Sequence, residues 1–178
     1  MGVRGGGEGI GHGRTEVPLG QNRCRRETFI GRPVDLAGMS DCIFCAIVDG
    51  DIPSRTVYED DDVLAFLDAN PLAPGHTLVI PKAHHERLNG LPDDLADAVL
   101  GTMYDLVDPV ERAVDADAST VAFNNGEAAG QEVPHVHAHI VPRFHGDGGG
   151  PIHAAAGSRP DLSDEELDAI LADIRDAA

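Results

Sequence analysis

The stretch HVHAHIVPR, at residues 135–143, places three histidines at alternate positions and follows them with an apolar run. Successive side chains of a β-strand point to opposite faces of the sheet, so residues two apart share a face. The pattern therefore predicts a strand in which His135, His137 and His139 line one surface, while the residues between them point into a core.

The charge balance of the chain is strongly acidic. Its 178 residues carry 31 Asp and Glu against 13 Lys and Arg, for a formal net charge of −18, and Lys82 is the only lysine. An acidic, lysine-poor surface suits solvation at high salt, so we hypothesise a halophilic protein, the alternative being an ordinary acidic cytoplasmic protein. The same charge argues against binding to nucleic acids or anionic membranes, which requires basic patches.

The composition changes near residue 39. Residues 1–38 hold six arginines, four acidic residues and many glycines, whereas the remainder holds 7 basic and 27 acidic residues. We expect 1–38 to be a disordered extension, either upstream of a true start at Met39 or a basic tail, followed by a domain at 39–145 and a helix-containing tail at 146–178. Without a membrane-length apolar run or a secretory signal, we expect a cytoplasmic protein.

Strand and helix patterns alternate along the expected domain. The expected elements are a helix at 44–49, strands at 56–59, 63–67 and 77–80, a helix at about 92–115 kinked at Pro109, a strand at 119–124, the histidine strand, and a last helix at 164–176 with Ser163 as its N-cap. Strands joined by hairpins, with one long helix crossing over, indicate an α+β fold built on an antiparallel sheet of about five strands.

Three kinds of site fit the alternating histidines: a metal site, a nucleophilic imidazole that attacks phosphorus, or a solvated polar face. The segment 124–131 just upstream reads NNGEAAGQ. A loop rich in glycine and amides offers N–H donors to anionic oxygens, which favours a phosphate neighbour.

Three longer stretches narrow this choice, namely CIFCAIVDGDIPS (42–54), VYEDDDVLAFLDANPLAPGHTLVIPKAHH (57–85) and NNGEAAGQEVPHVHAHIVPR (124–143). In order and spacing they resemble the histidine triad (HIT) family, and in particular its bacterial and archaeal nucleotide-hydrolase branch. The resemblance covers about residues 40–145 and implies the HIT-like fold, a homodimer, and hydrolysis or transfer of nucleotides.

The resemblance also implies roles for individual residues. His137 would be the nucleophile, His139 would contact the phosphate or leaving group, and His76 would support them from behind. The implied nucleotide-binding residues are Asp68 at the ribose, Asn124, Gly130 and Gln131 at the phosphate and leaving group, and Phe44, Ile47 and Leu67 around the base. The alternative for Asp68 is a purely structural role as a turn-capping residue, and the alternative for the three apolar residues is a place in the hydrophobic core.

A C-x-x-C pair at Cys42 and Cys45 suggests a second site. By itself the pair fits a redox motif, half of a metal site, or coincidence, although the βαβ setting of a redox motif is missing. Some relatives carry a structural zinc at such a pair, and the resemblance implies Cys42, Cys45, His84 and His135 as its ligands, with His85 as the alternative to His84. Such a site is closed, so the zinc would be structural.

We therefore expect an enzyme that acts on purine nucleoside phosphoramidates or dinucleoside polyphosphates through a nucleotidyl-histidine intermediate. The alternatives are a nucleotide-binding interaction protein without catalysis and a metal-dependent hydrolase. His145 and His153 follow the triad strand in a glycine-rich stretch, and we expect them at the surface near the rim of the active site.

Overall fold

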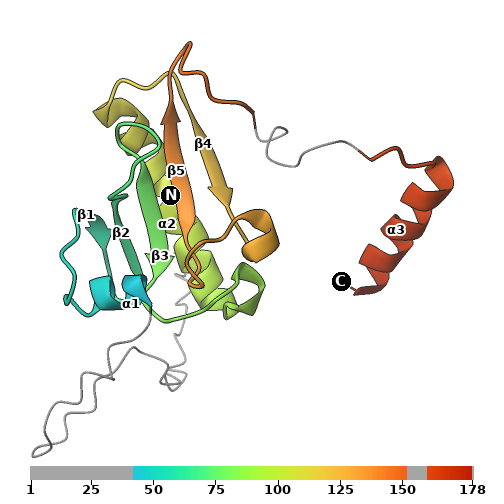
Figure 1. The fold of residues 1–178 in the computed structure, drawn as a ribbon. Coiled ribbons are helices and arrows are strands. Elements are labelled where there is room, and N and C mark those ends of the chain that lie inside the picture. Colours follow the sequence, from blue (N-terminus) through green and yellow to red (C-terminus); the bar gives the residue numbers. More distant parts are fainter. Residues whose placement is uncertain (1–41, 152–159, 178) are drawn as a thin grey trace, which may run out of the picture.

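The computed structural model describes residues 42–151 and 160–177, so the expectations for residues 1–38, for Met39 and for His153 lie outside the described residues. The domain is built on one antiparallel sheet in the order β1-β2-β3-β5-β4, which confirms the predicted α+β architecture (Figure 1). Its strands are β1 (Thr56–Glu59), β2 (Val63–Leu67), β3 (Thr77–Pro81), β4 (Ala118–Phe123) and β5 (Ala138–Arg143).

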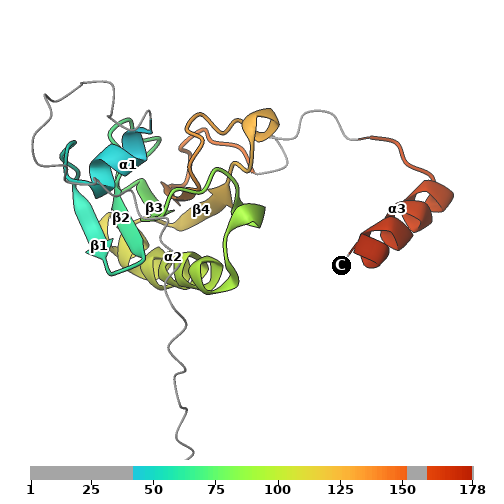
Figure 2. The same ribbon diagram turned by 90° about the horizontal axis from the view of Figure 1, so that it is seen from below.

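Helices cover both faces of the sheet. The short helix α1 (Ile43–Val48) lies on one face and the long helix α2 (Asp93–Ala113) on the other (Figure 2). Strand β2 contributes side chains to the core on both faces of the sheet, because Leu64 and Phe66 pack with α1 whereas Val63 and Ala65 pack with α2. Burial on both faces explains why β2 and β3 are continuous apolar runs without alternation.

Helix α2 follows the predicted apolar periodicity. Val99 and Val110 are buried, and Met103 and Leu106 pack against the same core cluster. Pro109 lies in the last turns, and the helix continues past it to Ala113. Two short 3-10 helices, η2 (Leu88–Gly90) and η3 (Glu127–Ala129), lie in the loops beside the histidines.

The strand that carries the histidines is shorter than predicted. Strand β5 begins at Ala138, so of the three histidines only His139 lies within it. Upstream, the backbone N–H of Val136 donates to the carbonyl oxygen of His85 at 2.7 Å rather than to a neighbouring strand. The prediction that one strand face presents all three histidines is therefore wrong, because the chain joins the sheet only at Ala138, after His137.

The last helix, α3 (Asp164–Ala177), begins at the predicted N-cap. Oγ of Ser163 accepts from the backbone N–H of Glu166 at 3.3 Å, and the Glu166 carboxylate accepts from the backbone N–H of Ser163 at 2.8 Å, which is a capping box. No side chain of α3 is buried. Among the described residues, no helix is long and apolar enough to cross a membrane.

Candidate active site and metal centre

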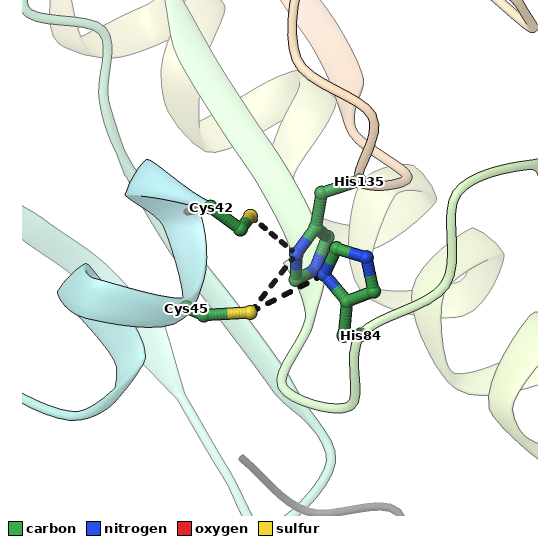
Figure 3. A group of neighbouring side chains, drawn as sticks. All are labelled: Cys42, Cys45, His84 and His135. Carbon is green, nitrogen blue, oxygen red and sulfur yellow. Dashed lines mark hydrogen bonds between the residues drawn. The ribbon is translucent and has the colours of Figure 1, made fainter. Parts of the chain in front are cut away.

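The four predicted metal ligands come together between α1 and the end of β3 (Figure 3). Cys42 caps the N-terminus of α1 and Cys45 lies in its first turn, while His84 and His135 arrive from two separate loops. One ligand atom from each of the four lies within 4.8 Å of the others. Of the two adjacent histidines proposed as ligands, His84 is the one that joins this group.

The spacing of the donor atoms fits a tetrahedral zinc ion. Metal–sulfur bonds of about 2.3 Å and metal–nitrogen bonds of about 2.0 Å put sulfur and nitrogen about 3.5 Å apart at the tetrahedral angle. Nδ1 of His135 lies 3.4 Å from Sγ of Cys42 and 3.7 Å from Sγ of Cys45, and Nδ1 of His84 lies 3.3 Å from Sγ of Cys45. Two thiols and two imidazoles are a donor set that zinc prefers.

A backbone carbonyl fixes the orientation of His135. Its Nε2–H donates to the carbonyl oxygen of Pro81 at 2.9 Å, so in the neutral ring Nδ1 keeps the lone pair and faces the thiols. Burial lowers the pKa of His135 to about 4, so that the ring is neutral at pH 7. A neutral, oriented imidazole is the form that binds a metal ion.

His137 is buried beside this group, and one hydrogen bond fixes which of its two ring nitrogens carries the proton. Its Nδ1 lies 2.7 Å from the carbonyl oxygen of His135, which only accepts hydrogen bonds, so Nδ1 carries the proton. The ring of Phe44 packs edge-on against it with centroids 5.2 Å apart, and the His139 ring does the same at 4.9 Å. The remaining nitrogen, Nε2, therefore keeps its lone pair in the neutral ring.

Behind His137, a chain of hydrogen bonds links His139 to His76. The backbone N–H of Leu72 donates to Nδ1 of His76 at 3.2 Å, so this nitrogen is an acceptor. Nε2 of His76 then donates to Nδ1 of His139 at 3.0 Å, which places the second proton of the chain on Nε2 of His139. Among the described residues that Nε2 is a buried atom without a partner, so it is a donor available to a ligand.

Both rings of this chain are neutral at pH 7. Burial lowers the pKa of His139 to about 4, with smaller contributions in the same direction from His137 and His76. Burial also lowers the pKa of His76, and the nearby Asp68 carboxylate opposes the shift. The Oδ2 atom of Asp68 lies 3.4 Å from Nδ1 of His76.

The loop of residues 124–131 closes over this region through Gln131. Oε1 of Gln131 accepts from the backbone N–H of Gly126 at 2.7 Å. Its Nε2 donates to the carbonyl oxygens of Glu86 at 2.8 Å and Val133 at 2.9 Å, with a longer contact to that of His135 at 3.3 Å. Gln131 thus joins three segments, and its predicted contact with a phosphate or leaving group stays a prediction.

Asn124 and Gly130 lie next to each other at the two ends of the same loop. Nδ2 of Asn124 approaches the carbonyl oxygen of Gly130 at 3.5 Å, and both residues are exposed. Gly130 has a left-handed backbone with φ of 85°, which glycine adopts without strain. Their predicted place at the phosphate is not tested by a bound ligand.

The residues predicted around ribose and base have mixed surroundings. Phe44 is buried and Ile47 packs against the same core cluster, whereas Leu67 is 37% exposed. Asp68 accepts from the backbone N–H of Asn70 at 2.9 Å, as a turn-capping Asp does. The carboxylate has further lone pairs, so ribose binding by Asp68 stays a prediction, as does the base slot.

Arg87 is a residue near the site that the sequence pattern did not indicate. It immediately precedes η2, and its guanidinium group lies against Gly126 in the loop 124–131. A single exposed arginine in a loop has no periodicity or motif that distinguishes it, so only the fold shows this contact.

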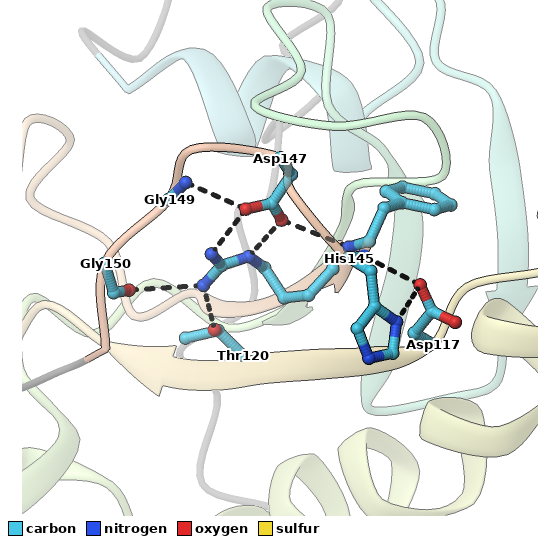
Figure 4. Close-up of polar contacts among 8 residues, drawn as sticks. Asp117, Thr120, His145, Asp147, Gly149 and Gly150 are labelled. Atoms are coloured by element: carbon cyan, nitrogen blue, oxygen red, sulfur yellow. Dashed lines mark hydrogen bonds and ion pairs between the residues drawn. The ribbon is translucent and has the colours of Figure 1, made fainter.

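A second polar cluster lies at the other end of β5 (Figure 4). There the Asp147 carboxylate accepts from Nε of Arg143 at 2.7 Å and from the backbone N–H of Gly149 at 2.8 Å. His145 pairs with Asp117 at 2.8 Å just ahead of β4. His145 was expected near the active-site rim; that expectation is wrong for this chain, because the strand places it at the end opposite His137.

A five-stranded antiparallel sheet with a helix on each face, and with buried histidines in the segment that leads into β5, defines the class of this protein as an α+β protein with a cluster of buried histidines. The family model described as HIT domain matches residues 49–146, which is more than half of the chain. The chain therefore belongs to the HIT domain family, which confirms the resemblance drawn from the sequence.

Individual relatives agree with this assignment. An uncharacterized HIT-like protein of Methanocaldococcus jannaschii is 51% identical over 108 residues, which is 60% of this chain and 82% of the relative. The adenylylsulfatase HINT3 of Arabidopsis thaliana is 40% identical over 104 residues, which is 58% of this chain and 53% of that protein. This chain thus spans about half of the plant relative.

Solved structures show the same fold. A member of the HIT family from Bacillus subtilis superposes with a TM-score of 0.70 at 38% identity, covering 78% of this chain and 98% of that one. A zinc-bound histidine triad family protein from Mycobacterium smegmatis does so with a TM-score of 0.58 at 36% identity, covering 78% and 98%.

Proposed function

We propose that this protein hydrolyses or transfers nucleotides through a covalent nucleotidyl group on His137. The hydrogen bond from Nδ1 of His137 to the carbonyl oxygen of His135, 2.7 Å long, carries the proposal. Because that bond holds the single proton of the neutral ring on Nδ1, Nε2 keeps a lone pair with which to attack phosphorus. A neutral imidazole is abundant at pH 7, unlike a deprotonated serine or lysine.

The reaction proceeds in two displacements. Nε2 of His137 forms a bond to the α-phosphorus while the bond from phosphorus to the leaving group breaks. Water then attacks the same phosphorus, the nucleoside monophosphate departs, and the imidazole is regenerated. The buried Nε2–H of His139, which has no partner among the described residues, is placed to donate to the leaving group or a phosphate oxygen.

The substrates in this proposal are purine nucleoside phosphoramidates or dinucleoside polyphosphates. Because one relative is named an adenylylsulfatase, we include nucleotides joined to sulfate as a further candidate class of substrate. Asn124, Gly130 and Gln131 would hold the phosphate and leaving group, Asp68 would hold the ribose hydroxyls, and Phe44, Ile47 and Leu67 would border the base.

Zinc has a structural role in the proposal. Four side chains would hold the ion in a closed set of donors, namely those of Cys42, Cys45, His84 and His135. The ion would link α1 to two loops and would have no coordination position left for substrate. The observations that support this role are the donor spacing and the hydrogen bond of His135 to Pro81.

A homodimer also belongs to the proposal. Strand β4 is an edge strand, paired only with β5, and its residues Ser119–Phe123 are half-buried. On α2, Tyr104 is 79% exposed. An edge strand and an exposed aromatic side chain are features that a second copy would cover. Light scattering at several concentrations tests this expectation, and a monomer at all of them would contradict it.

One experiment tests the enzymatic proposal directly. The His137→Asn variant is mixed with an adenosine 5′-phosphoramidate, and turnover and covalent adenylylation are followed by mass spectrometry. We expect the wild-type protein to carry the adenylyl group on His137, and the variant to bind nucleotide without turnover. The matched control is His145→Asn, an exposed histidine at the far end of β5.

The two rival functions give different results in this design. A nucleotide-binding protein without catalysis would show no adenylylated His137 in the wild type. A metal-dependent hydrolase would keep its turnover in His137→Asn and lose it reversibly on chelation while the protein stays folded.

A further inference from the structure

Arg87 lies directly on the loop that the proposed function assigns to the phosphate. Gly126, near the start of that loop, is buried and has φ of 102°, and a Cβ atom added to it would lie 2.8 Å from one terminal nitrogen of the Arg87 guanidinium. The two residues are therefore in van der Waals contact, and the guanidinium group covers the backbone of Gly126.

Hydrogen bonds hold Arg87 in this place from both sides. The backbone N–H of Leu88 donates to Oδ1 of Asn125 at 3.0 Å, and Nε2 of Gln131 donates to the carbonyl oxygen of Glu86 at 2.8 Å. The residues immediately before and after Arg87 are thus bonded to the loop 124–131. This segment and the loop form one wall beside the histidines.

The same wall is connected to the nucleophile. Gln131, which bonds to Gly126 beneath Arg87, also contacts the carbonyl oxygen of His135 at 3.3 Å. That carbonyl oxygen accepts the hydrogen bond of His137. Gly126, which lies under the guanidinium group, is therefore linked through Gln131 to the carbonyl oxygen of His135, which orients the imidazole of His137.

The charge of Arg87 is not neutralised within the part of the chain that the structure describes. Lys82, Arg112 and Arg143 each form an ion pair with a carboxylate, at 2.7 Å, 2.8 Å and 2.7 Å. Arg87 forms none among the described residues, as is also true of Arg55 and Arg175, but of these three only Arg87 lies on the loop 124–131. In a chain of net charge −18, a cation without a carboxylate partner beside a phosphate loop is available to an anionic ligand.

We propose that Arg87 binds the leaving group of the substrate and selects for one that departs as an oxyanion, such as a sulfate or a phosphate. The inference rests on the proposed function. When Nε2 of His137 bonds to phosphorus and the bond from phosphorus to the bridging oxygen breaks, both electrons of that bond stay on the departing oxygen. A guanidinium group stabilises this charge without giving up a proton, because it stays charged at all accessible pH values.

An amine leaving group has the opposite requirement. The departing nitrogen needs a proton, which comes from solvent; Arg87 does not supply it, and the Nε2–H of the neutral His139 contributes a hydrogen bond to the departing group. A positive charge at Arg87 also repels an ammonium group carried by such a leaving group. Arg87 therefore favours anionic over amine leaving groups.

The test compares three substrates with the same adenylyl group: adenosine 5′-phosphosulfate, diadenosine tetraphosphate and adenosine 5′-phosphoramidate. The variants are Arg87→Gln, which removes the charge, and Arg87→Lys, which keeps it. Arg112→Gln is the matched control, because Arg112 is an exposed arginine on α2. Helix α2 lies on the face of the sheet opposite to α1, whose Phe44 packs against His137. The folded state of each variant is checked by its unfolding temperature and zinc content.

We expect Arg87→Gln to lower the ratio of kcat/KM for an anionic leaving group to that for the phosphoramidate roughly ten- to a hundredfold, as expected for loss of a charge-assisted hydrogen bond. Arg87→Lys should recover part of the ratio, and Arg112→Gln should leave it at the wild-type value. A drop with the phosphosulfate alone assigns sulfate as the ligand of Arg87, and a drop with the tetraphosphate alone assigns phosphate.

An equal ratio in Arg87→Gln and wild type would overturn the inference. Single-turnover measurements distinguish a wrong inference about Arg87 from a wrong proposed function. They separate formation of the adenylyl-histidine, in which the leaving group departs, from its hydrolysis by water, in which the leaving group takes no part. Arg87→Gln should slow formation of the adenylyl-histidine from the anionic substrates more than its hydrolysis. If no adenylylated His137 forms in the wild-type protein with any of the three substrates, the proposed function itself is wrong.

Discussion

The carbonyl oxygen of His135 accepts a hydrogen bond from Nδ1 of His137 at 2.7 Å, while the imidazole of His135 turns its own Nδ1 toward the thiols of Cys42 and Cys45. One residue thus takes part in the proposed metal centre through its side chain and in the proposed active site through its backbone. A displacement of the His135 ring moves the carbonyl oxygen that sets the tautomer of His137.

Removing a zinc ligand should therefore affect both stability and catalysis. In Cys45→Ser we expect loss of bound zinc, a free energy of unfolding lower by at least about 2 kcal/mol, and a lower kcat, because α1 and the His135 segment lose their common ligand. Zinc content, urea unfolding and steady-state kinetics measure the three effects. His85→Asn is the matched control, because His85 lies outside the group of four ligands. Equal zinc content in Cys45→Ser and wild type would contradict the ligand assignment.

Gln131→Met should weaken the wall beside the histidines. The variant keeps the length of the side chain but leaves the carbonyl oxygens of Glu86 and Val133 without their donor, at a cost of about 1–3 kcal/mol in stability. We expect kcat to fall more than KM rises, since the loss acts on the orientation of His137. Glu132→Gln, an exposed neighbour, serves as control. A rise in KM alone would instead indicate that Gln131 contacts the substrate.

Stability should fall as the solution becomes more acidic through the pKa range of His139. Burial lowers its pKa in the folded protein to about 4, whereas an unfolded histidine titrates near 6.5. Between these values the unfolded chain binds more protons, so the free energy of unfolding decreases as the pH falls from about 6.5 to about 4. In His139→Asn this dependence should be weaker, and in the exposed control His145→Asn it should match the wild type. Urea unfolding at several pH values measures it.

Phe44→Ala should separate the core role of Phe44 from its proposed place at the base. Phe44 is 7% exposed and contacts the rings of Phe66 and His137, so truncation should cost about 3–5 kcal/mol. Phe44→Leu keeps most of the volume and should recover much of that stability. If Phe44 also borders the base, KM for the purine nucleotide rises in Phe44→Leu; an unchanged KM would assign Phe44 to the core alone. Thermal unfolding and steady-state kinetics provide the two measurements.

The strands with strong local patterns were predictable. The predicted strand at 63–67 coincides with β2, and that at 77–80 differs from β3 by one residue, because apolar runs bounded by turn residues carry the signal locally. The N-cap at Ser163 was predictable for the same reason, since a capping box lies within four residues of chain.

The predictions that were wrong, and the features that were not predicted, concern contacts between segments that are distant in the sequence. A period of two cannot show that the chain joins the sheet only after His137, because the backbone N–H of Val136 donates to the carbonyl oxygen of His85, 51 positions earlier. The four-way bonding of Gln131 reaches back 45 residues to Glu86, and no local pattern encodes it. The position of Arg87 on Gly126 depends on the same docking of two loops. The zinc ligands were foreseen only because a family resemblance supplied a partner set 93 residues apart.

The strand order β1-β2-β3-β5-β4 has a consequence for how the protein is made. Strand β4 pairs with β5 alone, and β5 is the last strand of the sheet to leave the ribosome. Until residues 138–143 emerge, a nascent chain has one edge of β3 uncovered and β4 without a neighbouring strand. The sheet is therefore completed by insertion of its final strand between two earlier ones, and the segment that bears His137 reaches its place in the same late step.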